Sequence, residues 1–165
     1  MNYTVIVPFY NEEKNISRFN DQIIKNIKKN LTDKRIFEII YVDDGSIDRT
    51  YDELKQLNNV KVDTTIIKHR TNLSQSAALN TGISHSKYEN LIIMDGDLQN
   101  DPEDLTNMLK EYEKGIDMII GWRKKRRDSF FSKTLPSIIA NYIVRLFSKS
   151  NIHDHGCAFK IFKKE

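Results

Sequence analysis

The stretch Leu91-Ile92-Ile93-Met94-Asp95-Gly96-Asp97 joins an apolar run to two carboxylates within seven residues. The apolar part predicts a buried strand, and alternate residues of a strand point the same way. We therefore expect Asp95 and Asp97 to aim at one spot just beyond the sheet edge. Two convergent carboxylates repel each other and are costly to desolvate unless a cation lies between them. A divalent metal that carries a phosphorylated substrate fits this arrangement.

The chain has 165 residues, which is enough for one domain with a proper core and too short for two. Its composition, 39% hydrophobic and 30% charged, is typical of a soluble globular protein. The single cysteine, Cys157, excludes an internal disulfide framework and suits a reducing compartment. The first residues carry no secretory signal, and no run reaches the roughly 18 apolar residues that span a bilayer. These features predict a cytoplasmic chain that does not itself cross a membrane.

Charge is distributed unevenly between two parts of the chain. Residues 122–165 hold 11 Lys and Arg against 3 Asp and Glu, whereas residues 1–121 hold 15 against 20. A basic C-terminal third would attract an anionic surface or ligand. The basic run Arg123 to Arg127 lacks interleaved aromatic residues, so phosphate or membrane contact is favoured over nucleic acid.

Strand-like and helix-like patterns alternate along the chain, which predicts an α/β fold with a mainly parallel central sheet flanked by helices. A last amphipathic helix, Phe130 to Lys149, is predicted either to join the core or to lie on anionic lipid. The expected strands are 3–8, 36–42, 62–68, 90–94 and 116–121, and the expected earlier helices are 12–29, 48–57, 73–84 and 102–115.

In an open parallel sheet, ligands bind at the carboxyl ends of the strands. Polar residues follow three of the expected strands, so we expect them to form one site. They are Pro8, Tyr10, Asn11 and Glu12 after the first strand, Asp43, Asp44, Gly45 and Ser46 after the second, and Asp95, Gly96, Asp97 and Gln99 after the fourth.

In this order the motifs resemble family 2 glycosyltransferases, and among them the polyprenyl-phosphate glycosyltransferases that include dolichyl-phosphate mannose synthase. The resemblance covers nearly the whole chain and implies a GT-A-like nucleotide-diphospho-sugar transferase fold. The matching segments are Val7-Pro8-Phe9-Tyr10-Asn11-Glu12-Glu13, Val42-Asp43-Asp44-Gly45-Ser46-Ile47-Asp48-Arg49-Thr50, residues 94–103 and Gly121-Trp122-Arg123.

The resemblance also implies roles for single residues. Asp95, Asp97 and Gln99 match positions around the metal, Mg²⁺ or Mn²⁺, and the donor phosphates. Arg123 matches a phosphate-binding position. Asp154 lies in a segment that resembles the family's Asp-containing segment before a Gly-Cys pair, where it would orient the acceptor or tune a neighbouring Lys or Arg. The catalytic residues implied are Asp97, Arg123 and Asp154. The residues implied to bind the donor nucleotide are Pro8, Tyr10, Glu12, Asp43, Asp44 and Asp95.

These features predict a metal-dependent, inverting glycosyltransferase that moves a sugar from a nucleotide-sugar donor to a polyprenyl phosphate. A UDP-sugar is favoured and GDP-mannose is the other candidate donor. Residues 1–121 would bind the donor, and residues 122–165 would face the acceptor at the inner side of the cell membrane, with peripheral contact through 123–149. The chain is expected either to be a catalytic domain trimmed before transmembrane helices or to attach peripherally.

Two departures from the family pattern lie near the expected site. Gly96 stands where the family often has alanine, a change expected to matter little because that side chain would point away from the metal. Leu73-Ser74 occupies a stretch where a glycine is common, which leaves the loop shape near the sugar open.

Simpler interpretations compete with these predictions. Asp43 and Asp44 fit an ordinary turn before a helix, and Asp95 and Asp97 fit solvated residues at a strand end. His153, His155 and Cys157 lack the paired spacing of a zinc site.

At the level of the whole protein, the alternatives are a family 2 transferase with a saccharide hydroxyl acceptor and a non-catalytic nucleotide-binding module.

Overall fold

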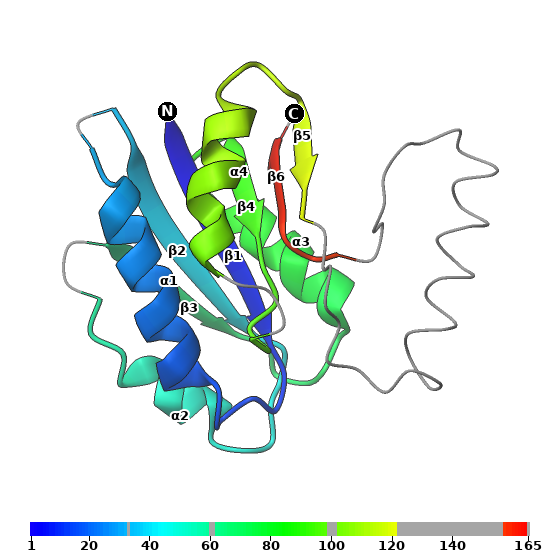
Figure 1. The fold of residues 1–165 in the computed structure, drawn as a ribbon. Coiled ribbons are helices and arrows are strands. Elements are labelled where there is room, and N and C mark those ends of the chain that lie inside the picture. Colours follow the sequence, from blue (N-terminus) through cyan, green and yellow to red (C-terminus); the bar gives the residue numbers. More distant parts are fainter. Residues whose placement is uncertain (33, 60–61, 99–101, 122–156, 165) are drawn as a thin grey trace, which may run out of the picture.

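A six-stranded sheet with the order β3-β2-β1-β4-β6-β5 forms the centre of the protein. The computed structural model describes residues 1–32, 34–59, 62–98, 102–121 and 157–164 (Figure 1). Strands β1 (Asn2–Phe9), β2 (Ile36–Asp43), β3 (Asp63–Lys68) and β4 (Asn90–Ile93) are parallel to one another, which confirms the mainly parallel sheet. Their carboxyl ends therefore meet at one end of the sheet.

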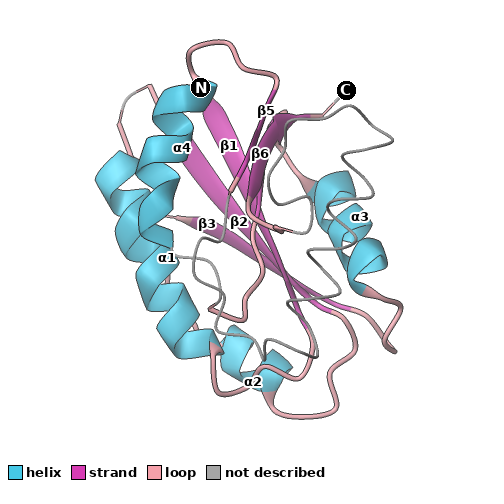
Figure 2. Cartoon of the chain, turned by 45° about the vertical axis from the view of Figure 1, so that its right-hand side comes forward, coloured by secondary structure: helices cyan, strands magenta, loops and turns pink. Residues whose placement is uncertain are grey.

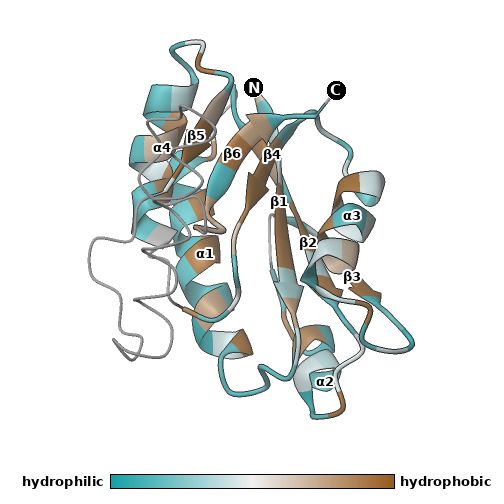
Figure 3. Ribbon diagram, turned by 90° about the vertical axis from the view of Figure 1, so that its right-hand side faces the viewer, coloured by the Kyte–Doolittle hydropathy of each residue, from teal (hydrophilic) through white to brown (hydrophobic). Residues whose placement is uncertain are grey.

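Helices cover both faces of this sheet. Figure 2 shows α1 (Ile16–Asn30) and α4 (Leu105–Tyr112) on one face and α3 (Gln75–His85) on the other, while the short α2 (Thr50–Lys55) lies near the lower end. A 3-10 turn, η1 (Pro102–Asp104), leads into α4. The central strands β1 and β2 are buried on both faces, which explains their nearly continuous apolar sequence and their brown colour in Figure 3.

Helix α1 packs one apolar stripe on the sheet. Ile16, Phe19, Ile23 and Ile27 are at most 1% exposed, and they recur at spacings of three and four residues. The helix begins four residues later than predicted. The cause is local, because the backbone N–H groups of residues 11, 12 and 13 donate to side chains that follow β2 and are held in a turn.

The strand β6 (Lys160–Lys163) was not predicted from the sequence. It lies between β4 and β5 (Met118–Ile120) and runs antiparallel to both. Phe159 and Ile161 are buried against the α1 and α4 side of the core, so the C-terminal part of the described chain completes the sheet. Among the helices that the structure describes, none has the length and apolarity needed to cross a bilayer. The predicted helix 130–149 lies outside the described residues.

Candidate functional site

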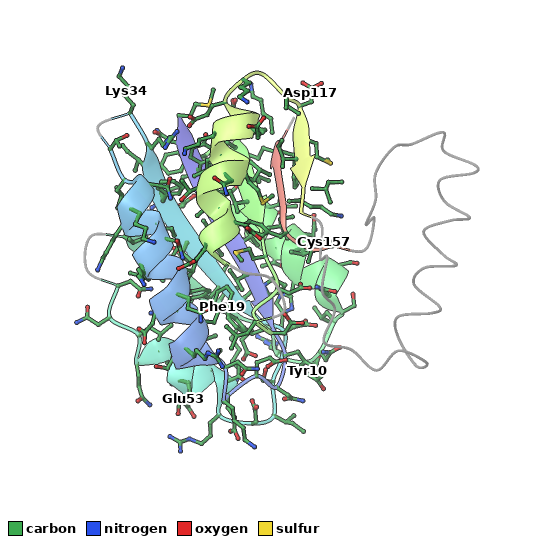
Figure 4. The ribbon with its side chains drawn as sticks, in the orientation of Figure 1. Tyr10, Phe19, Lys34, Glu53, Asp117 and Cys157 are labelled. Carbon is green, nitrogen blue, oxygen red and sulfur yellow. The ribbon has the colours of Figure 1, made fainter. Side chains whose placement is uncertain are left out.

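A cavity of about 340 Å³ lies at the carboxyl ends of β1, β2 and β4. Figure 4 shows Tyr10 and Glu53 near the lower end of the molecule and Lys34 and Asp117 at the opposite end. Seven residues predicted to form the site line this cavity together. They are Pro8, Tyr10, Glu12, Asp44, Asp95, Gly96 and Asp97, and the remaining lining residues are Phe9, Asn72, Ser74 and Gln75.

Other residues predicted to form the site are not among those that line this cavity. Gln99, Arg123 and Asp154 lie outside the described residues, as do His153 and His155. The described residues that do not line it are Asn11, Asp43, Gly45 and Ser46, and Asp43 is fully buried.

The two carboxylates of Asp95 and Asp97 reach the cavity by a route that differs from the sequence prediction. Strand β4 ends at Ile93, and Gly96 and Asp97 belong to a turn, so strand alternation does not align the two side chains. Leu98 follows with a positive φ of 61°, which is uncommon for a bulky residue. The turn, and not an extended strand, brings both carboxylates to the cavity.

Gly96 is required by its contact with Phe9. A Cβ atom built on Gly96 would lie 2.0 Å from Cε1 of Phe9. Phe9 has little room to move, because it packs edge-on against Phe19 and Tyr41, with ring centroids 5.7 and 5.6 Å away. The structure therefore speaks against the expectation that alanine would matter little here, because its Cβ would meet the ring of a core residue.

The Asp43 carboxylate is buried with one oxygen lacking a hydrogen bond. Oδ1 accepts a bond from the backbone N–H of Ser46 at 3.0 Å. Oδ2 has no hydrogen-bond partner among the described residues, and the nearest cation, Nζ of Lys68, is 3.8 Å away. Lys68 also lies 4.6 Å from the centre of the Tyr51 ring. A buried acceptor of this kind is costly unless a donor reaches it.

Asp44 braces the loop that precedes α3. Its two oxygens accept bonds from the backbone N–H groups of Leu73 and Ser74, each at 3.0 Å. Its Oδ1 also lies 2.7 Å from Nδ1 of His69, whose Nε2 is 2.9 Å from Oγ1 of Thr81 on α3. Because a carboxylate only accepts, His69 donates from Nδ1. Asp44 thus lines the cavity, but both of its carboxylate oxygens are engaged in hydrogen bonds that hold the loop forming the cavity wall.

The braced loop and the first residue of α3 supply cavity residues that the sequence prediction missed. They are Asn72 and Ser74 in the loop and Gln75 in α3. Ser74 has φ 99° and ψ 154°, a conformation that glycine adopts far more easily than serine. The only sequence signal here was the departure from the family's usual glycine. Gln75 donates from Nε2 to Oδ1 of Asp95 over 2.6 Å, and no motif drew attention to it.

The loops after β1 and β2 are tied together beside the cavity. The backbone N–H of Asn11 donates to Oγ of Ser46 at 2.9 Å, and the Asn11 side chain accepts from the backbone N–H of Ile47 at 3.0 Å. The ring of Tyr10 remains 45% exposed at this edge. An exposed aromatic face on a fixed loop can stack on a planar ligand.

The acidic side of the cavity fits a divalent cation. Mg²⁺ and Mn²⁺ prefer oxygen ligands, and Mg²⁺ is often held by one or two carboxylates together with water and substrate phosphates. Asp95 and Asp97 supply such oxygens. In the part of the chain that the structure describes, no group of three or more His, Cys, Asp or Glu residues could hold a metal by itself. Two carboxylates are the number that typically binds Mg²⁺ together with water and substrate phosphates.

Comparison with known proteins defines the class. The model of the glycosyl transferase family 2 matches residues 4–165. The chain is 33% identical over 162 residues to dodecaprenyl-phosphate galacturonate synthase of Rhizobium johnstonii, covering 97% of this chain and 47% of that protein. It is 30% identical to undecaprenyl-phosphate 4-deoxy-4-formamido-L-arabinose transferase of Proteus mirabilis, covering 98% of this chain and 48% of the relative. The chain thus spans about half the length of these relatives.

Solved structures agree on the fold. A Pyrobaculum calidifontis mannosyltransferase in complex with GDP-Man and Mn²⁺ has a TM-score of 0.55 and 28% identity, covering 66% of this chain and 31% of that one. Staphylococcus aureus TarS 1–349 in complex with UDP-GlcNAc has a TM-score of 0.58 and 21% identity, covering 81% and 38%. The predicted GT-A-like fold is confirmed, and the molecule is of the glycosyltransferase class. More narrowly, the chain belongs to glycosyltransferase family 2, as its motifs indicated.

Proposed function

We propose that this chain is the donor-binding part of a polyprenyl-phosphate glycosyltransferase, which moves a sugar from a nucleotide-sugar to a polyprenyl phosphate. The single observation that carries the proposal is the cavity that gathers Tyr10, Glu12, Asp95 and Asp97 at the strand ends. The two relatives named above, a dodecaprenyl-phosphate synthase and an undecaprenyl-phosphate transferase, support this acceptor class.

The reaction is metal-dependent in this proposal. Asp95 and Asp97, together with Gln99, would hold Mg²⁺ or Mn²⁺, which would supply positive charge to stabilise the leaving nucleoside diphosphate. The complex of the Pyrobaculum mannosyltransferase with GDP-Man and Mn²⁺ supports a divalent ion in this fold. Asp97 is assigned to the catalytic set because it would act on the diphosphate through this cation.

The acceptor chemistry explains why no strong general base is needed. A phosphate monoester is largely ionised near neutral pH, because its second pKa is about 6. Its oxygen attacks the anomeric carbon as the bond to the diphosphate breaks, and one such displacement inverts the configuration. Arg123 aligns the two anions, which otherwise repel each other, and Asp154 orients the acceptor.

Base recognition is assigned to Tyr10 and Asp43, with Pro8 and Glu12 beside the base and ribose. The buried Oδ2 of Asp43 can only accept a hydrogen bond, so it favours a base whose ring nitrogen carries a proton. Uracil and guanine present such an N–H, whereas cytosine and adenine present a lone pair there. The donor is therefore a UDP-sugar in the first place, with GDP-mannose as the other candidate.

The uneven charge distribution suggests separate roles for the two parts of the chain. Residues 1–121 carry the donor site, and the basic residues 122–165 face the acceptor. Peripheral contact through 123–149 brings the cavity to the cytoplasmic face of the membrane, where anionic lipid attracts Lys and Arg.

A radiolabelled-donor assay on the full-length protein with undecaprenyl phosphate tests the proposal. We expect a lipid-linked product that requires a divalent metal, and its loss in Asp97→Ala. Asp117→Asn is the matched control, because Asp117 lies at the opposite end of the molecule (Figure 4). Full turnover in excess chelator would contradict the metal site. Transfer to a saccharide hydroxyl instead would contradict a polyprenyl-phosphate acceptor. Tight nucleotide binding without any transfer would contradict the transferase activity.

A further inference from the structure

Gln75, the first residue of α3, connects this helix to Asp95 of the acidic pair. Its Nε2 lies 2.6 Å from Oδ1 of Asp95, although 20 residues separate the two in sequence. The orientation of the amide is set by chemistry, because an ionised carboxylate accepts and never donates. Gln75 is therefore a hydrogen-bond donor to a carboxylate of the proposed metal site.

The backbone that carries Gln75 is held from two sides. Asp44 binds the N–H groups of Leu73 and Ser74 immediately before it, and His69 links Asp44 to Thr81 on the same helix. Further along α3, Ala78 is fully buried against the sheet, and a Cβ at Gly82 would lie 2.4 Å from Ile6. The backbone position of Gln75 is thus fixed, although its side chain is exposed.

The charge of this donor matters for the proposed metal site. A lysine at the same place would neutralise Asp95 and compete with a cation. A neutral amide orients the carboxylate without adding a positive charge that would compete with the cation. The oxygen that accepts one bond keeps a further lone pair, so the contact and a metal bond are compatible.

We propose that Gln75 is a positioning residue that holds the Asp95 carboxylate in the orientation in which it binds a divalent cation. The inference rests on the proposed function, since it requires that Asp95 and Asp97 bind the cation. Partners that hydrogen-bond to ligating carboxylates orient them, and their loss weakens metal binding about 10- to 100-fold.

Mn²⁺ binding to the full-length protein, measured from the electron paramagnetic resonance signal of free Mn²⁺ in the presence of UDP or GDP, tests this role. Gln75→Ala removes the donor, and Gln75→Leu removes it while keeping the bulk of the side chain. We expect both to raise the Mn²⁺ dissociation constant at least about tenfold. Ser76→Ala, the next residue on the same turn, should leave it unchanged. The metal-free melting temperatures of all three variants should stay at the wild-type value, because these side chains are exposed.

The outcomes separate this inference from the proposed function. If wild type binds Mn²⁺ and Asp97→Ala does not, while Gln75→Ala binds it as wild type does, the role of Gln75 is overturned and the metal site stands. Tighter binding by Gln75→Ala would show that the amide competes with the cation, which also overturns it. If wild type and Asp97→Ala bind Mn²⁺ equally, or neither binds it, both proposals fall.

Discussion

Among the described residues, three that are not glycine have a positive φ, and Ser74, which lines the cavity, is the most strained of them. Asn11 and Leu98, at 55° and 61°, fall in the left-handed region, whereas Ser74 has φ 99° and ψ 154°. The backbone conformation of Ser74 is nearly exclusive to glycine, and placing another residue in it costs about 1–3 kcal/mol. The strain persists because Asp44 binds the backbone N–H groups of Leu73 and Ser74. Backbone strain is thus concentrated where the cavity wall is built.

Replacing Ser74 by glycine should stabilise the protein. We expect Ser74→Gly to raise the free energy of unfolding by about 1 kcal/mol, because relief of strain exceeds the entropy that glycine loses on folding. Urea denaturation of wild type and variant measures this difference. Ser76→Gly, placed inside α3, is the control and should lower stability by about 0.5–1 kcal/mol. A lower free energy of unfolding for Ser74→Gly than for wild type would show that the serine side chain stabilises the protein by more than the strain costs.

Gly96 offers the opposite case, in which adding one methyl group should be harmful. Gly96→Ala forces a Cβ to within 2.0 Å of Phe9 and should destabilise the protein by about 1–3 kcal/mol, as other overpacked sites do. The double variant Gly96→Ala/Phe9→Leu should recover part of the loss, because a smaller side chain makes room. Denaturation of the single and double variants measures the coupling. Additive effects would contradict a direct clash between the two positions.

At the scale of elements, the sequence predicts the helices and strands of residues 1–121 well but misses β6. The apolar pattern of β1, β2 and α1 is local, and each element can be read from its own residues. β6 has four residues, and its place depends on pairing with β4 and β5, which lie about 40 to 70 residues earlier in the chain. No local pattern encodes that insertion.

The candidate site divides in the same way. Residues directly after a strand, such as Tyr10, Asp95 and Asp97, could be predicted because parallel strands end together. Gln75 and His69 could not, because their partners Asp95 and Asp44 are reached only after the loop before α3 folds onto the sheet end. The same distant contact gives Asp44 its bracing position, where the sequence indicated either a ligand contact or an ordinary turn before a helix.

A charged cluster far from the cavity ties α4 to the sheet. Arg35, just before β2, donates to both oxygens of Glu113, just after α4, and the Tyr3 hydroxyl donates to the same carboxylate at 2.9 Å. The bond from Arg35, with that from Tyr3, holds the pKa of Glu113 below its usual value. A depressed pKa means that the carboxylate stabilises the fold above the unfolded pKa of about 4.3 and loses this contribution as pH falls through the folded value.

Glu113→Gln should therefore cost stability near neutral pH but not in acid. We expect a loss of about 1 kcal/mol at pH 7, since both side chains are only about a quarter exposed. The gap between wild type and variant should narrow below about pH 4. Urea denaturation at a series of pH values measures it, and Glu111→Gln, exposed on α4, is the control with little expected change. A gap that persists at pH 3 would contradict the role of the carboxylate charge.

At the scale of the whole molecule, the proposed donor site makes two different demands on one ligand. Asp43, which is buried and does not itself line the cavity, would supply an acceptor for a ring N–H, while Asp95 and Asp97 in the cavity would require a cation to bind a diphosphate. A nucleoside without phosphates can satisfy only the first, and a free diphosphate only the second. The donor class should thus be visible as a joint dependence on base and metal.

A thermal-shift screen of UDP, GDP, CDP and ADP with and without Mn²⁺ measures that dependence. A ligand that binds only the folded state stabilises it by about 2.7 kcal/mol at a concentration 100 times its dissociation constant. We expect UDP, and to a smaller extent GDP, to raise the melting temperature with Mn²⁺, whereas CDP and ADP should not. Asp43→Asn should remove the preference for UDP over CDP, because an amide can rotate to present either a donor or an acceptor to the base. Equal shifts for UDP and CDP in wild type would contradict base recognition by Asp43, and shifts that persist unchanged in chelator would contradict the cation.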